Sequence, residues 1–301
     1  MPDDTRAYVF EKLFNDRWDP TTGTLSNPVV LVSEVVAAIE DWNAAHPAEE
    51  PKKIDNKYAF FKDFARNKKR ANKRWPKSIL ARNYTARQLT GRGASFEFVP
   101  LEPGQTVPFT NVVPPPAPST ETHRIESVSL PLTSRLLGRG DEPWLIQVLV
   151  RLHVIETHLS LYSTRNILQI DHLQMNVKLH LTEIDALFLA IEQLRPGITQ
   201  EVIVNCEAKG LTDDIIESQV ISQAQSVFQS QSIHQDIVIP MAVKPLRQSV
   251  VHVVEFEAIS RSAAPSTTTL TIASDALYQF IPPVPGIGEK KTSRQRKLLT
   301  D

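Results

Sequence analysis

A proline-rich stretch at residues 113–120 divides this chain into two parts. Four of the five positions from Pro114 to Pro118 are proline, which favours extended polyproline II backbone and resists both helix and sheet. We therefore place a linker at 113–120. The sequence predicts one domain at 1–112, a second domain at 121–285, and a basic, flexible tail at 286–301.

The composition excludes several classes of protein. The chain has 301 residues, and 41% of them are hydrophobic, which is enough for sizeable cores. Its one cysteine, Cys206, cannot form an intramolecular disulfide and argues against a cysteine-based zinc site. The N-terminus is acidic and polar, unlike a secretory signal, and no apolar run approaches the roughly 20 residues that span a bilayer. We expect a cytoplasmic protein without a membrane partner.

Positive charge is concentrated in one segment of the first domain. Residues 51–92 contain fourteen lysines and arginines but only two acidic residues, whereas residues 1–50 contain three basic and ten acidic residues. A block of this kind indicates a surface for a polyanion. The alternative is a solvated basic face without a partner.

The pattern around this block predicts a mainly helical, winged-helix-like domain. Helical periodicity covers residues 5–18 and 28–45, and Trp75-Pro76 ends the basic helical segment. Two β-prone segments, 84–88 and 94–99, flank a turn with two glycines. Tyr58, Phe60, Phe61 and Phe64 are expected to form a buried face.

Such a domain would place its cationic helix in or along a groove of double-stranded DNA, with the hairpin on the phosphates. The candidate DNA-binding residues are Lys62, Arg66, Lys69, Arg70, Lys73, Arg74, Lys77, Arg82, Arg87 and Arg92.

The second domain reads as α/β, a mixed sheet flanked by helices. Residues 124–137 look irregular, and residues 143–161 have a helical apolar stripe that includes Glu156, although their valines also suit a strand. Met175 to Ile191 reads as β structure, and Pro196-Gly197 as a turn.

A buried strand, Val202 to Lys209, comes next. Thr212 or Asp213 can cap the helix that follows it, and two further β runs cover 236–243 and 250–256. The residues after them look loosely organised.

The strand at 202–209 carries the candidate chemistry. Residues two apart in a strand point the same way, so Glu207 and Lys209 share a face. If Asp185 ends the neighbouring strand, its carboxylate can converge with that of Glu207 on one Mg²⁺ ion, which needs only one or two carboxylates besides water and substrate phosphate. Lys209 would then stabilise developing charge or help to deprotonate the attacking water.

An acidic strand end followed by an apolar strand with (D/E)-x-K resembles the PD-(D/E)XK nuclease superfamily, which includes most type II restriction endonucleases. By that resemblance Asp185, Glu207 and Lys209 match the three catalytic positions, with Asp185 and Glu207 as metal ligands. The resemblance covers roughly residues 121–260 and implies a restriction-endonuclease-like fold. Ile184 stands where the motif often has proline.

Four further residues are possible supporting members of the site. Glu183 shares a face with Asp185 and competes with it, but Asp185 directly precedes the apolar run 186–189. Glu156 resembles an acidic residue that some members supply from the first core helix, and Gln219 and Gln223 resemble glutamines that follow the lysine strand in some members. The alternative for Glu207 and Lys209 is an exposed ion pair, which contributes little energetically.

Rival chemistries lack their motifs. No histidine pair has zinc spacing, no G-x-x-x-x-G-K-[ST] supports a nucleotide cofactor, and no G-x-S-x-G marks a serine hydrolase. The sequence therefore favours a Mg²⁺-dependent, double-strand DNA endonuclease of type II restriction type, acting as a homodimer. A DNA-binding regulatory protein and a repair or structure-specific nuclease are the alternatives.

Overall fold

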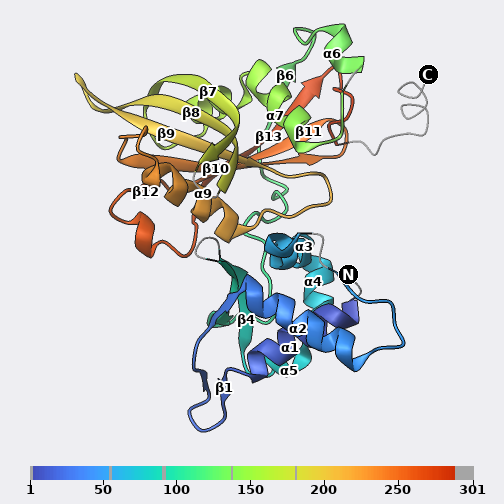
Figure 1. The fold of residues 1–301 in the computed structure, drawn as a ribbon. Helices are drawn as coiled ribbons and strands as arrows, with labels where there is room; N and C mark the ends of the chain where they lie inside the picture. Colours follow the sequence, from blue (N-terminus) through green and yellow to red (C-terminus); the bar gives the residue numbers. More distant parts are fainter. Residues whose placement is uncertain (1–2, 54–55, 90–92, 137, 180–181, 289–301) are drawn as a thin grey trace. The chain divides into compact units, whose positions relative to one another are not determined.

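The computed structural model describes residues 3–53, 56–89, 93–136, 138–179 and 182–288 (Figure 1). The chain divides into two compact units, an N-terminal unit of residues 1–111 and a C-terminal unit of residues 112–301. Within the described ranges, no helix is long and apolar enough to cross a membrane.

The N-terminal unit combines short helices with a three-stranded antiparallel sheet in the order β3-β5-β4. Its elements are α1 (Asp3–Asn15), β1 (Trp18–Asp19), β2 (Thr24–Leu25), β3 (Val29–Leu31), α2 (Val32–Ala45), η1 (Lys57–Ala59), α3 (Phe60–Ala65), α4 (Lys68–Arg74), α5 (Lys77–Leu80), β4 (Tyr84–Gln88) and β5 (Ala94–Pro100).

An aromatic core holds the N-terminal unit together. The ring of Phe10 lies 4.8 Å from that of Phe64 and 4.9 Å from that of Trp75, and Phe60, Phe61 and Phe64 are buried as expected. Tyr58, which we placed on the same buried face, is instead 62% exposed. It lies in η1, before α3 begins, so the helical periodicity that buries the phenylalanines does not extend to it.

The helix expected over residues 28–45 begins later than its periodicity suggests. Val29 to Leu31 form β3, which pairs with β5, and α2 starts at Val32. Glu34 explains the boundary, because its carboxylate accepts a hydrogen bond from the backbone N–H of Leu31 at 2.7 Å and caps the helix there.

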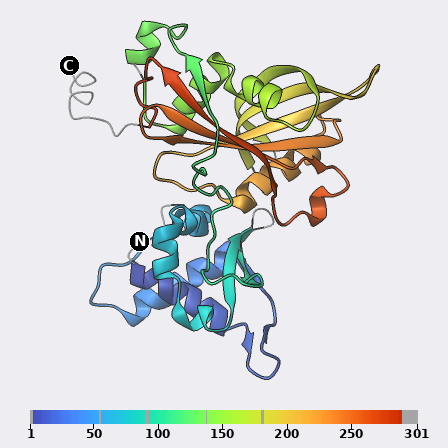
Figure 2. The ribbon, with the colours of Figure 1, turned by 180° about the vertical axis from the view of Figure 1, so that it is seen from behind.

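The C-terminal unit confirms the α/β class, with a large mixed sheet flanked by helices (Figures 1 and 2). Its elements are β6 (Thr122–Glu126), α6 (Leu132–Leu136), α7 (Glu142–Arg151), α8 (Val154–Leu161), β7 (Ile167–Leu179), β8 (Thr182–Arg195), β9 (Ile198–Ala208), α9 (Glu217–Gln229), β10 (Ile237–Leu246), β11 (Val250–Phe256), β12 (Ile259–Ser260), η2 (Ala264–Ser266) and β13 (Ile272–Ile281).

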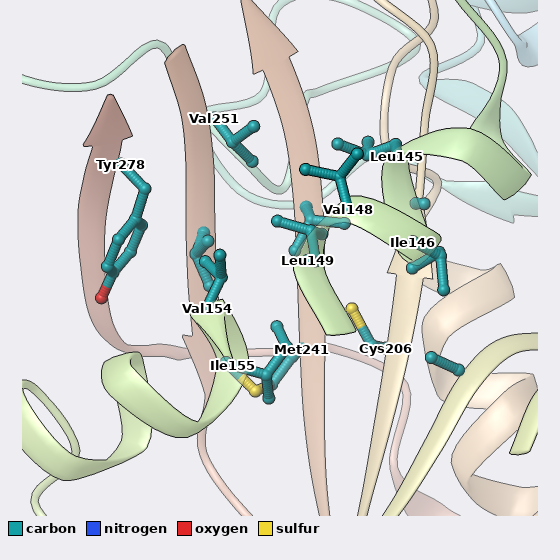
Figure 3. Packing of buried hydrophobic residues seen from close by; sticks show 14 of the residues in the cluster. Leu145, Ile146, Val148, Leu149, Val154, Ile155, Cys206, Met241, Val251 and Tyr278 are labelled. Carbon is teal, nitrogen blue, oxygen red and sulfur yellow. The ribbon is translucent and has the colours of Figure 1, made fainter. Parts of the chain in front are cut away.

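The strand order is β6-β13-β11-β10-β9-β8-β7, with β12 beside β10. Strands β7, β8 and β9 run antiparallel in succession, whereas β9 and β10 are parallel and are joined through α9. Helices α7 and α8 cover one face of the sheet, where their side chains meet Cys206, Met241 and Val251 (Figure 3). Helix α9 packs on the opposite face, so each face is buried by a helix.

Two predicted elements of the C-terminal unit are divided in the structure. The β run from Met175 to Ile191 is a hairpin, in which Leu179 of β7 pairs with Thr182 of β8. Residues 143–161 are helical, which removes the strand alternative, but the helix is interrupted between α7 and α8. His153 has φ 52°, a left-handed conformation, at this interruption.

Two segments expected to lack regular structure contain regular elements. Within 124–137 lie the end of β6, which pairs in parallel with β13, and the helix α6. Strand β13 is a ten-residue strand in the region that looked loosely organised. Both misreadings arise because these strands are stabilised by partners distant in the sequence, which no local pattern reveals.

The proline-rich segment is attached to the C-terminal unit. Val113 is 4% exposed and packs with Ile215, Val220 and Ala242, and Thr120 Oγ1 donates a hydrogen bond to Asp275 at 3.3 Å. At the other end, Ile287 is buried in the sheet core, so packing continues past the expected boundary at residue 285.

Candidate active site

Asp185 and Glu207 approach each other across the β8–β9 hairpin. Ala186 of β8 pairs with Cys206 of β9, so the antiparallel register carries Asp185 to the level of Glu207. The backbone N–H of Ala208 donates a hydrogen bond to Asp185 Oδ2 at 2.7 Å, which fixes this carboxylate beside the end of β9. Cys206 lies on the other face of β9, in the core beneath α7 and α8 (Figure 3).

The structure distinguishes Asp185 from its competitor. The Glu183 side chain is exposed. In the β-sheet register, Glu183 lies opposite Lys178 of β7, the strand that borders β8 on the side away from β9. Its contribution to the site comes from its backbone, because its carbonyl oxygen accepts a hydrogen bond from Gln223 Nε2 at 3.0 Å.

Glu207 and Lys209 form a buried ion pair. Glu207 is 1% exposed and Lys209 is 4% exposed, so the exposed strand-end pair considered above is not what forms. Lys209 Nζ contacts Glu207 Oε1 and donates a hydrogen bond to the carbonyl of Ala208 at 3.1 Å. Burying both charges is costly unless they are paired and hydrogen-bonded, as they are here.

Glu142 is a site residue that the sequence analysis missed. It is the first residue of α7, and its Oε1 lies 3.9 Å from Lys209 Nζ. Sequence reasoning had selected Glu156 for this helix, but the interruption at His153 changes the face on which Glu156 lies. Glu156 Oε1 instead lies 3.1 Å from His153 Nδ1.

A signal for Glu142 was present in the sequence. Asp141 caps α7 by accepting a hydrogen bond from the N–H of Trp144 at 3.1 Å, and Pro143 follows in the first turn. An Asp-Glu-Pro sequence is a helix start, and it places Glu142 at the exposed end of an otherwise apolar helix.

Gln223 connects α9 to the site, whereas Gln219 does not. Gln223 is fully buried, and its Nε2 donates a hydrogen bond to Glu207 Oε2. Gln219, one turn earlier, is half-buried and makes no hydrogen bond to any of the acidic site residues within the described structure. The helix begins at Glu217 after Ile216, so neither Thr212 nor Asp213 caps it as expected.

Asp185 and Lys209 both have shifted pKa values. Burial, and then the charge of Glu207, raise the pKa of Asp185 to about 8, against the opposing hydrogen bond from Ala208. Burial alone would lower the pKa of Lys209, but the charges of Glu207 and Glu142 outweigh it and raise the pKa. Three carboxyl groups therefore surround one ammonium group.

The donor set fits Mg²⁺ better than a metal that needs a complete protein cage. Asp185 and Glu207 supply hard carboxylate oxygens, and Mg²⁺ takes one or two of these and completes its shell with water and phosphate. Across the described ranges, no group of three or more histidine, cysteine or acidic side chains is arranged to hold a metal ion.

The candidate DNA-binding residues of the N-terminal unit fall into two classes. Most of them, from Lys62 through Lys77, lie on or beside α3, α4 and α5, and Lys69, Arg70 and Lys73 are exposed on α4. Arg82 instead stacks on Trp18, with its guanidinium 4.9 Å from the ring centroid, and donates a hydrogen bond to Asn15.

Arg87 is also engaged within the unit, because its guanidinium pairs with Glu97 across the β4–β5 hairpin. Arg92 lies outside the described residues. Arg66 and Arg74 are exposed and half-buried, respectively.

Comparisons with known proteins provide no relative. Family models, curated proteins and solved structures were searched, and none of them matches this chain.

Proposed function

We propose that this protein is a Mg²⁺-dependent endonuclease that cuts double-stranded DNA, of the PD-(D/E)XK kind and of type II restriction type. One observation carries the proposal. Asp185, Glu207 and Lys209, selected from spacing along the chain, lie together at one end of the β8–β9 hairpin. A chance (D/E)-x-K sequence has no reason to meet an acidic partner from the preceding strand.

Each residue of the proposed site would have a separate role in cleavage. Asp185 and Glu207 would hold Mg²⁺, which when bound supplies a Lewis acid for the scissile phosphate and lowers the pKa of its water. Lys209 is held by Glu207 with its ammonium group inside the site, where it can donate to a phosphate oxygen as negative charge develops. Glu142 lies near this ammonium group and can orient it.

The N-terminal unit supplies a surface for the substrate. Its sheet order β3-β5-β4 and its helices α1, α2 and α4 support the winged-helix-like interpretation. We expect Lys69, Arg70 and Lys73 of α4 to contact DNA, because α4 exposes three cations on a helix whose other side is buried. Arg82 and Arg87 would contribute to stability in place of DNA contact.

The direct test is cleavage of plasmid and phage DNA by the purified full chain with and without Mg²⁺. Asp185→Ala, Glu207→Ala and Lys209→Ala should each abolish cutting. Glu201→Ala and Arg195→Ala are matched controls, because both side chains are exposed and lie toward the turn of the β8–β9 hairpin, with Glu201 opposite Ile191 and Arg195 opposite Ile198. These controls should cut as the wild type does.

Each alternative function has its own outcome in this assay. Tight duplex binding without cleavage of any DNA, methylated or not, would replace the proposal with a DNA-binding regulatory protein. Nicking only at branches or damage would indicate a repair nuclease. Discrete fragments support restriction-type specificity, and a double-strand cut by a homodimer would be accompanied by sedimentation as two chains.

A further inference from the structure

A buried chain of amide groups leads from β9 to the proposed site. Asn205 Nδ2 donates a hydrogen bond to Gln223 Oε1 at 3.2 Å, and Gln223 Nε2 donates to Glu207 Oε2. Asn205 and Gln223 are both fully buried. Asn205 precedes Glu207 by two residues on β9, so both side chains extend from the same face toward α9.

The orientation of the Gln223 amide decides whether the Glu207 carboxylate faces a hydrogen-bond donor or an acceptor. An amide has a donor end and an acceptor end of nearly the same shape, so a rotation by half a turn would present an oxygen to the carboxylate. The backbone carbonyl of Glu183 accepts from Gln223 Nε2, while Asn205 donates to Gln223 Oε1. These two contacts hold the amide from its opposite ends with its NH₂ group on Glu207.

Asn205 is a poor choice for stability alone. Its strand neighbours Ile203 and Val204 are buried and apolar, and its own Oδ1 is buried without a hydrogen-bond partner among the described residues. An unsatisfied buried oxygen costs about 1–3 kcal/mol. Leucine has the same branching and would remove this unpaired oxygen, but it would leave the buried Gln223 Oε1 without its donor, so the use of Asn205 lies in its bond to Gln223.

We propose that Asn205 is a positioning residue that acts through Gln223 to orient the Glu207 carboxylate for Mg²⁺. The inference rests on the proposed function. Asn205 itself touches neither metal nor substrate. Its NH₂ group fixes the Gln223 amide, and that amide fixes one oxygen of Glu207 while Lys209 contacts the other. Partners of this kind commonly change metal affinity or activity by about tenfold to a hundredfold.

The first measurement tests the positioning itself and needs neither metal nor cleavage. In the full chain labelled with ¹⁵N-glutamine, the side-chain NH₂ resonances of Gln223 are assigned from their loss in Gln223→Leu. They should move and broaden in Asn205→Leu. Unchanged Gln223 resonances in Asn205→Leu would overturn the proposal, because the amide would then be held without Asn205.

The second measurement tests the consequence for the site. Asn205→Leu should weaken Mg²⁺ binding, followed by calorimetry of the full chain, by about tenfold or more, and should lower kcat while KM for DNA stays the same. The matched control is Gln225→Leu, which removes a bond from the same helix to the carbonyl of Ala264 and should leave both quantities unchanged.

A double variant separates positioning from a general loss of packing. If Asn205 acts only through Gln223, Asn205→Leu combined with Gln223→Leu should have the same Mg²⁺ affinity as Gln223→Leu alone. Additive losses would contradict the relay. A wild-type protein that neither binds Mg²⁺ nor cuts DNA would refute the proposed function, and the Gln223 resonances would still decide whether Asn205 orients the amide.

Discussion

Asp185→Asn should make the metal-free protein more stable. Burial and the charge of Glu207 raise the pKa of Asp185 from 3.8 to about 8, so its carboxyl is ionised in the unfolded chain but protonated in the folded one near neutral pH. Folding must therefore take up a proton at a free-energy cost. Asparagine has the same shape, carries no charge, and keeps an oxygen for the N–H of Ala208.

The size and sign of the effect follow from the two pKa values. One pKa unit corresponds to about 1.36 kcal/mol, so the gap between 3.8 and about pH 7 gives an upper bound of about 4 kcal/mol. The Asp185 side chain is half-buried, and we expect a gain of about 1–3 kcal/mol after solvent screening. Because the folded state binds the extra proton, this contribution to wild-type stability falls as pH rises from about 4 to about 8.

The assay is urea unfolding of the wild type and Asp185→Asn with a chelator, then with Mg²⁺. With the chelator the variant should have the higher free energy of unfolding and a weaker pH dependence. Mg²⁺ should stabilise only the wild type, since a ligand that binds the folded state adds stability with its concentration. Asp171→Asn, at an exposed carboxylate of β7, serves as the control and should change neither result.

Two results would refute this reasoning. A variant less stable than the wild type without metal would show that Asp185 is ionised and well compensated in the folded protein. Equal stabilisation of both proteins by Mg²⁺ would show that the ion binds elsewhere.

Three further outcomes are expected. Burial lowers the pKa of His158 from 6.5 to about 4, so below about pH 6.5 the unfolded chain binds a proton that the folded chain does not. The free energy of unfolding of the wild type should therefore fall by up to about 3 kcal/mol toward pH 4. In urea titrations, His158→Gln should lack this loss. Glu142→Gln should slow cleavage by about tenfold or more while duplex binding, measured by fluorescence anisotropy with a chelator, is unchanged. Replacing Lys69, Arg70 and Lys73 by alanine should reduce the slope of log affinity against log salt by about 2–3, whereas Arg82→Ala should mainly lower the melting temperature.

The sequence predicted those parts of the fold whose signal is local. The apolar run before Glu207, the Pro196-Gly197 turn and the helix carrying Gln223 each lie where periodicity and turn chemistry placed them. Of the predicted site, Asp185, Glu207, Lys209 and Gln223 lie together, because strand alternation and hairpin pairing set their positions within a short span of chain.

The remaining features depend on contacts that the sequence does not display. Strands β6 and β13 are adjacent although about 150 residues separate them, so neither could be placed from its own pattern. Glu156 was chosen because its periodicity is continuous with that of Leu145 and Leu149, yet the left-handed backbone at His153 shifts that phase. Glu142 enters the site through its contact with Lys209 of another element.

The attachment of the proline-rich segment bears on how the two units could be exchanged between proteins. Phe109 belongs to the core of the N-terminal unit and Val113 to that of the C-terminal unit, so the boundary between the two units lies between these residues. A chimera joined after Asn111 would keep Phe109 with the N-terminal core and Val113 with the C-terminal core. A junction at the end of the prolines would remove Val113 from its packing against Val220 of α9. This is the helix that places Gln223 against Glu207. The boundary between the two units therefore lies before the proline-rich segment, and that segment belongs to the C-terminal unit.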